Sequence, residues 1–156
     1  METASIKALK DELKHQSSAE LLELCLKLIR FKKENKELLT YLLFEVHNEE
    51  RYIQNVKNEM DTLFEAINTK SYFFIRKSAR KILTSTKKYI RFSKKKETEV
   101  ELLLYFCVKL KNFKPSIKKS PRLQNILTTQ IKLIEKLITT LHEDLQYDFR
   151  LELDEL

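Results

Sequence analysis

The chain has 156 residues, no glycine, two prolines and a formal net charge of +7. A chain of this length buries enough surface to fold as one domain without a disulfide or a metal. Phosphate-binding loops, dinucleotide-binding turns and nucleophile elbows all depend on glycine, so the absence of glycine excludes these enzyme motifs.

The composition is dominated by Leu, Lys, Glu and Ile, a balance that favours helices over strands. We therefore expect an all-α protein. Its residues 1–156 are predicted to form a single domain of about six helices, packed as an irregular antiparallel bundle or array. Residues 146–156 are a candidate for a loosely ordered acidic tail of this domain.

Several features bear on the cellular location. The N-terminal segment METASIKALKDELK is charged and amphipathic, unlike a signal peptide. The longest strongly apolar run, residues 102–108, is far shorter than the roughly 20 residues that span a membrane. Cys25 and Cys107 lie in apolar helical runs without paired spacing, which predicts two core thiols in a reducing compartment rather than a disulfide. We expect a cytoplasmic protein with no transmembrane segment.

The first predicted helix runs from about Ser5 to His15. Ser17 and Glu20 then form an S-x-x-E capping box, in which the serine oxygen and the glutamate carboxylate satisfy amides of the first turn. This box predicts the start of a second helix with the apolar residues Leu21, Leu24, Cys25, Leu28 and Ile29. Residues 32–36 form a polar break after it.

Apolar residues recur at intervals of three and four from Leu39 to Ile67, and the phase is kept across residues 47–50. This pattern favours one continuous helix of about 42 Å, with a kink or a turn near Asn48 as the alternative. Glu49 occupies an apolar position of the pattern. A carboxylate at such a position is expected to be paired, to lie at a kink or to face a cavity.

A strongly basic helix is predicted over residues 71–96, with Ser71 as its N-cap. When the segment is projected at 100° per residue, its apolar side chains fall on one arc. Seven cationic side chains fall on the opposite arc, and they are Arg76, Lys77, Arg80, Lys81, Lys87, Lys88 and Arg91. Residues 70–122 hold 17 Lys and Arg against three acids, whereas residues 142–156 hold six acids and one arginine. The acidic segment could therefore fold back on the cationic arc or compete with an external anion for it.

Thr98 and Glu101 form a second capping box, which predicts a helix over residues 98–112. This helix is apolar on nearly all sides, so we expect it at the centre of the core. Asn68 and Asn112 lie where helices should end. Because asparagine is the next best residue after glycine for a left-handed C-cap, both are expected to adopt that conformation.

The C-terminal part of the chain begins with a basic loop over residues 112–119, which contains Pro115. Ser120 is the expected N-cap of a last helix, with Pro121 at the first position, where a missing amide costs nothing. The apolar residues of this helix continue to Leu145.

Motifs for metal binding or acid–base chemistry are weak. Glu12 and His15 form one E-x-x-H, half of a di-iron motif, but neither His47 nor His142 follows a glutamate at the same spacing. No nucleophile lies beside a base. The sequence predicts a non-enzymatic protein with no catalytic residue, no metal and no cofactor.

The cationic arc is the candidate binding site. The leading prediction is a cytosolic interaction module that binds an acidic protein partner through residues 71–96. The alternative is binding to the phosphate backbone of RNA or DNA, with Phe74 and Phe92 flanking the arc to stack on an unpaired base. A basic amphipathic helix also suits an anionic membrane surface, although its apolar arc is better explained by a core. The oligomeric state stays open, because the pattern from Leu39 to Ile67 could pack internally or against a second copy.

Four stretches carry a resemblance to a known family. They are Ile6-Lys7-x-Leu9-Lys10-x-x-Leu13, Ser18-x-Glu20-Leu21, Ala79-Arg80-Lys81-Ile82 leading to Tyr89-Ile90-x-Phe92-Ser93-Lys94, and Glu101-Leu102-Leu103-Leu104-Tyr105-Phe106. Over about residues 5–110 the chain resembles an uncharacterised family of small bacterial all-helical proteins, catalogued only as a domain of unknown function. The resemblance implies a bacterial cytosolic setting and an all-helical fold, and it brings no activity, cofactor or catalytic residue.

Overall fold

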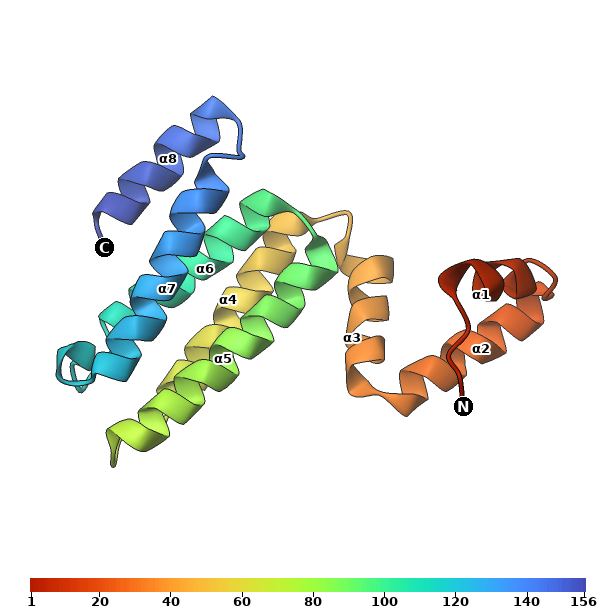
Figure 1. The fold of residues 1–156 in the computed structure, drawn as a ribbon, viewed down its shortest axis with the longest axis horizontal. Helices are drawn as coiled ribbons and strands as arrows, with labels where there is room; N and C mark the ends of the chain where they lie inside the picture. The colour runs from red at the N-terminus through yellow and green to blue at the C-terminus, as the bar shows by residue number, and fades with distance from the viewer. The chain divides into compact units, whose positions relative to one another are not determined.

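The computed structural model describes residues 1–156 and contains eight α-helices and no strands (Figure 1). The all-α prediction is confirmed, but the number of helices is eight rather than six. The chain forms two compact units, which we call the N-terminal unit (residues 1–44) and the C-terminal unit (residues 45–156). Residues 143–154, which include most of the predicted acidic tail, form the last helix.

The N-terminal unit contains α1 (Ile6–Leu13), α2 (Ser18–Phe31) and α3 (Lys33–Thr40). The predicted capping box of Ser17 and Glu20 opens α2 with both of its hydrogen bonds in place. The Ser5 side chain, which the sequence predicts to lie inside the first helix, caps α1 instead. The polar break is shorter than expected, because only Lys32 separates α2 from α3.

The prediction of one continuous helix from Leu39 to Ile67 is wrong, and the alternative of a break near Asn48 is confirmed. After α3 the chain forms a five-residue π-helical turn, Tyr41–Glu45. The next helix, α4 (Glu49–Glu65), begins only after Asn48. The Asn48 side chain accepts a hydrogen bond from the Arg51 amide at 3.0 Å. An asparagine side chain that serves a backbone amide in this way starts a new helix rather than continuing the old one.

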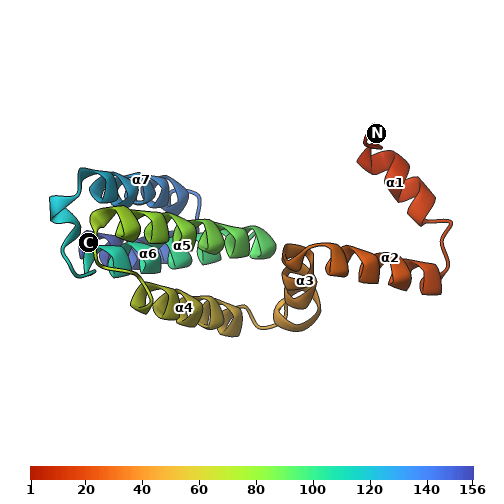
Figure 2. The same ribbon diagram turned by 90° about the horizontal axis from the view of Figure 1, so that it is seen from below.

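The C-terminal unit packs α4, α5 (Tyr72–Ser93), α7 (Pro121–Ile138) and α8 (Glu143–Asp154) around α6 (Lys96–Lys111). Figure 2 shows α5, α6 and α7 side by side. The prediction that the helix over residues 98–112 is innermost is confirmed. Its buried residues are Thr98, Val100, Leu102, Leu103, Leu104, Phe106, Cys107 and Leu110.

Several predicted helix ends need correction. Neither Asn68 nor Asn112 is left-handed, because neither has a positive φ, and Asn112 has a φ of −87°. α4 already ends at Glu65, with Ala66 as its C-cap. Lys94, which ends α5, is the left-handed residue, with a φ of 60°. The predicted last helix stops at Ile138, and His142 caps a separate helix, α8.

The capping box of Thr98 and Glu101 is also absent. α6 begins at Lys96, two residues before Thr98, and no side chain caps it. The Thr98 hydroxyl and the Glu101 carboxylate instead contact residues of α4. Ser120 and Pro121 do open α7 as predicted.

Candidate functional site

The seven predicted cations lie on one face of α5, which we call the basic face. Ser71 caps this helix by accepting a hydrogen bond from the Phe74 amide at 3.4 Å, as the sequence predicts. The opposite face is anchored in the core by Ile75, Ala79, Ile82, Thr86 and Ile90. Of the seven cationic side chains, Lys77, Arg80, Lys81 and Arg91 are exposed, and Arg76, Lys87 and Lys88 are half-buried.

Five cations of the basic face form no salt bridge, namely Arg76, Lys77, Arg80, Lys81 and Lys87. Other cations of the same unit are paired. Lys57 lies 2.6 Å from Glu101, Lys95 lies 3.2 Å from Glu49, and Lys109 lies 2.9 Å from Asp61. The charge of these five cations is therefore not neutralised by neighbouring carboxylates, whereas the charges of Lys57, Lys95 and Lys109 are.

Two aromatic rings extend the basic face at the start of α5. Phe73 is 57% exposed and Phe74 is 42% exposed, and their ring centroids lie 5.6 Å apart in an edge-to-face arrangement. The Arg76 guanidinium lies 5.6 Å from the centroid of Phe73, a cation–π geometry. Sequence reasoning missed Phe73, although its spacing of three residues from Arg76 places it on the basic face.

Phe92, which the sequence predicts as a second ring for stacking on a base, is not exposed for such stacking. It is only 8% exposed, and its ring packs edge-to-face on Tyr89 at 5.9 Å. A phenylalanine at the edge of a helical arc goes to whichever side offers apolar contacts, and the projection alone does not show that side.

The loop between α6 and α7 brings further positive charge to the N-terminal end of α5. The Tyr72 hydroxyl donates a hydrogen bond to the Ser116 carbonyl oxygen at 2.8 Å and so fixes the loop there. The exposed cations of this loop are Lys114, Lys118 and Lys119.

The acidic C-terminal helix packs elsewhere. α8 contacts α6 and α7, which lie between it and α5 in Figure 1. The Lys111 ammonium donates to the Glu155 carbonyl oxygen at 3.1 Å near the end of α8. Desolvation raises the pKa of Glu152 above its ordinary value, and the nearby charges of Glu101, Glu155 and Asp148 act in the same direction. α8 therefore concentrates negative charge beside α6 instead of covering the basic face.

Glu49, the acid at an apolar position, is paired and lies at the helix break. Its Oε1 atom accepts hydrogen bonds from the hydroxyls of Ser93 and Thr98, the latter at 2.7 Å. The Lys95 ammonium lies 3.2 Å from its Oε2 atom. Glu49 thus connects the start of α4 to the α5–α6 turn.

A second polar cluster joins α4 to α6. The Tyr105 hydroxyl donates to both carboxylate oxygens of Asp61, at 2.7 and 2.9 Å, and Lys109 lies 2.9 Å from the same carboxylate. Desolvation alone would raise the pKa of Asp61, but the hydrogen bonds from Lys109 and Tyr105 and the Lys109 charge outweigh it and hold this pKa below its ordinary value. Desolvation and the adjacent Asp61 raise the pKa of Tyr105 to about 12.

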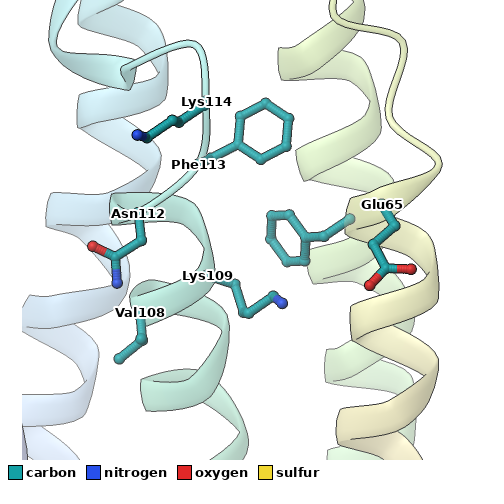
Figure 3. Close-up of a pocket in the computed structure, with 7 residues that line it drawn as sticks. Glu65, Val108, Lys109, Asn112, Phe113 and Lys114 are labelled. Carbon is teal, nitrogen blue, oxygen red and sulfur yellow. The ribbon is translucent and has the colours of Figure 1, made fainter.

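One hollow of about 360 Å³ lies beside this cluster, between α4 and the end of α6 (Figure 3). Phe64, Val108 and Phe113 give it an apolar lining, and the Phe64 and Phe113 ring centroids are 6.1 Å apart. Figure 3 shows the Phe113 ring and the Lys109 side chain directed across the hollow toward α4. Glu49 does not line it.

The two cysteines have different environments. Cys107 is buried in α6 as predicted, and burial raises the pKa of its thiol to about 12. The prediction that Cys25 is a core residue is wrong, because it lies exposed on α2. No residue of α2 is buried, so an apolar sequence around Cys25 does not make a core position there.

Glu12 and His15 are both exposed at the end of α1, and no three His, Cys, Asp or Glu side chains gather as a metal site requires. None of the helices combines the length and apolarity that crossing a bilayer demands. No protein-family model, no curated protein and no solved structure matches the chain. The resemblance of the sequence to the bacterial helical family therefore stays a prediction.

Proposed function

We propose that the protein binds nucleic acid through the basic face of α5. The observation that carries this proposal is the set of five cations there that have no carboxylate partner, while α8 packs on α6 and α7. Phosphates meeting such a face gain ion pairs without breaking internal ones, so the favourable Coulomb energy is not offset by lost salt bridges.

The size of the basic face suits a stretch of phosphate backbone. From Arg76 to Arg91 the helix rises about 22 Å. Each phosphate that a cation neutralises releases condensed counterions, so binding of a single strand through five cations predicts a log–log salt slope of about −3.5. The exposed Lys118 and Lys119 at the N-terminal end of α5 extend the positive surface.

Phe73 and Phe74 favour single strands over duplexes as the ligand. Exposed rings beside cations can stack on unpaired bases, and a base on an aromatic side chain contributes about 1–3 kcal/mol. In a duplex the bases are already stacked on each other and offer no free face. We therefore propose single-stranded RNA or DNA in the cytoplasm, the compartment that the sequence predicts.

An acidic protein surface is the second candidate, in the role of a non-enzymatic interaction module. The observation that favours it is the same pair of exposed rings, because an apolar patch beside a charged face is typical of protein interfaces. The two candidates differ in what Phe73 and Phe74 contact, a base or an apolar side chain, and they can be separated with defined ligands.

The test is fluorescence anisotropy of labelled single-stranded RNA, duplex DNA and polyglutamate, titrated with the protein across salt concentrations. The informative variant is Lys77→Gln/Lys81→Gln. Its matched control is Lys132→Gln/Lys136→Gln, which removes two exposed lysines at the same spacing from α7. We expect the α5 variant to lower the salt slope for RNA by about 1.5 and the α7 control to leave it unchanged.

A Phe73→Ala variant tests the stacking step. It should weaken binding of the single strand by at least about fivefold and leave duplex binding unchanged. Absence of RNA and DNA binding even at low salt would overturn the proposal. Polyglutamate binding that depends on Lys77 and Lys81, without RNA binding, would assign the face to an acidic protein instead.

A further inference from the structure

The hollow between α4 and the end of α6 has the size of a small-molecule site and lies outside the basic face. Its volume of about 360 Å³ is at the lower end of the range of roughly 300–1,000 Å³ for ligand sites, so it suits one ring system rather than a large ligand. All of its lining residues belong to the C-terminal unit, from Phe64 and Glu65 on α4 to residues 108–114. The hollow is therefore complete within one compact unit.

The hollow has an apolar side and a polar side. In Figure 3 the Phe113 ring lies on the side toward α4, and the Phe64 ring centroid is 6.1 Å from it. The same view shows Asn112 and Lys114 on the other side of the last turn of α6. Val108, which is 40% exposed, shares the surface of this turn with Asn112, four residues further on. A planar ring that stacks on Phe113 can therefore carry a polar group that reaches Lys114.

The charges around the hollow are arranged in the same way. Lys109 lies 2.9 Å from Asp61, so this pair contributes little net charge. Glu65 and Lys114 are both exposed, and neither has a partner of opposite charge. The hollow thus offers a carboxylate that can accept hydrogen bonds beside α4 and an ammonium group on the opposite side.

A nucleotide carries the groups that complement this arrangement. The base is a planar ring that can stack on Phe113, and an exocyclic amino group can donate to the Glu65 carboxylate. The phosphate supplies an anion for Lys114. A fatty acid or a simple aromatic acid would satisfy the ammonium group but would bring no donor to Glu65.

The hollow also lies near the start of the basic face. The Tyr72 hydroxyl holds the Ser116 carbonyl oxygen at 2.8 Å, and Phe113 is three residues before Ser116. Three residues of chain span at most about 11 Å. Phe73, the exposed ring of the basic face, directly follows Tyr72. A strand on the basic face can therefore continue across the α6–α7 loop, where exposed lysines can pair with its phosphates.

We propose that the hollow binds one unpaired base of the single strand on the basic face, and that it prefers bases with an exocyclic amino group. The base stacks on Phe113, its amino group donates to Glu65, and a phosphate pairs with Lys114. This inference rests on the proposed function, because the basic face brings the strand to the hollow. Contacts to phosphates carry no sequence information, so Glu65 is the residue that determines base preference.

Cytosine and uracil are the matched ligands for a test of this preference, because both are single rings and only cytosine carries the amino donor. By fluorescence anisotropy at neutral pH, we expect oligocytidine to bind about fivefold more tightly than oligouridine of the same length. Glu65→Gln should remove the preference, since an amide can accept from cytosine and donate to uracil. Glu135→Gln, at an exposed position of α7, is the matched control and should retain it.

Free nucleotides locate the base without the basic face. Cytidine monophosphate and uridine monophosphate are titrated separately into the ¹⁵N-labelled full chain, and amide chemical shifts are followed by NMR. We expect saturable shifts at residues 108–114, with the cytidine nucleotide bound about fivefold more tightly. Lys114→Gln should weaken the binding of both nucleotides to the same extent, and Lys132→Gln on α7 should leave it unchanged.

A variant that fills the hollow provides an independent test. Val108→Trp places a large ring in the hollow from an exposed position, and it should abolish the nucleotide shifts and the preference for oligocytidine. Strand binding through the basic face should remain. Leu151→Trp is the matched control, because Leu151 is 51% exposed on α8, and it should behave as the wild type.

Three results would overturn the inference. Equal affinities of the wild type for oligocytidine and oligouridine would exclude a base preference. Nucleotide shifts that are absent from residues 108–114 would place the base elsewhere. If either result accompanies strand binding with the expected salt slope, only the hollow is excluded and the proposed function stands. Saturable binding of cytidine monophosphate in the hollow by a chain that binds no strand would contradict both, and would assign the hollow to a free nucleotide.

Discussion

The Thr98 hydroxyl donates a hydrogen bond to Glu49 Oε1 at 2.7 Å, across 49 positions of sequence. The Ser93 hydroxyl donates to the same oxygen, and Lys95 pairs with the other. One carboxylate at the start of α4 thus holds the last residue of α5, the turn after it and the first turn of α6. Because the Glu49 side chain is only 17% exposed, water weakens its hydrogen bonds to Ser93 and Thr98 little.

Replacing this carboxylate should destabilise the fold. Glu49→Ala leaves the buried Thr98 hydroxyl without its acceptor and removes the partner of Lys95, so we expect a loss of about 1–3 kcal/mol in the free energy of unfolding. Urea denaturation at neutral pH measures it. The control is Glu50→Ala, which removes the same charge from the first turn of α4 at an exposed position. Equal losses in both variants would mean that the helix dipole, not the contacts of Glu49, is responsible.

The sequence predicted the features that depend on neighbouring residues. Ser17, Ser71 and Ser120 each cap the helix expected of them, and the apolar faces of α5 and α6 lie in the core. A serine cap needs only an amide two or three residues ahead, so its geometry is local. The position of the basic face could be predicted for the same reason, because helical periodicity alone determines which side chains share a face.

The predictions that were wrong concern residues whose contacts are distant in the sequence. Thr98 has the spacing of a capping residue, but Glu49 competes for its hydroxyl across 49 positions. Cys25 lies in an apolar stretch of sequence and is exposed, whereas Phe92 lies in a basic stretch and is only 8% exposed. Which apolar side chains become buried depends on which helices meet, and short-range periodicity does not contain that information.

The stability of the α4–α6 contact should depend on pH through Asp61. Its pKa is lower in the folded chain than in the unfolded one, so its contribution is present above the unfolded value of about 3.9 and is lost as the pH falls through the folded value. Asp61→Asn should cost about 1 kcal/mol at pH 7, and the difference from wild type should shrink in acid. Denaturation series between neutral and acidic pH measure this. Glu65→Gln, on the same helix, should not reproduce the trend.

The charge of Glu152 should affect folding stability with the sign opposite to that of Asp61. Desolvation and the neighbouring acids raise its pKa, so its ionised form disfavours the folded state at neutral pH. Glu152→Gln should therefore raise the melting temperature at pH 7. The gain should disappear as the pH falls below the unfolded pKa of about 4.3, where the carboxyl is protonated in both states. Glu135→Gln removes the same charge from α7 and should give no such rise. A gain that is independent of pH would contradict the assignment to this carboxylate.

The thiol of Cys107 should report the opening of the core. It is buried in α6 with a pKa of about 12, and only the thiolate reacts with disulfide reagents. In a Cys25→Ser variant we expect labelling at least roughly 10³-fold slower than that of a free thiol, because reaction requires an unfolded population below about one in a thousand. Urea should accelerate it in parallel with unfolding. The control is Cys107→Ser, in which the exposed Cys25 is the remaining thiol and reacts directly. Fast labelling of Cys107 without denaturant would show that α6 opens independently of the helices that pack around it.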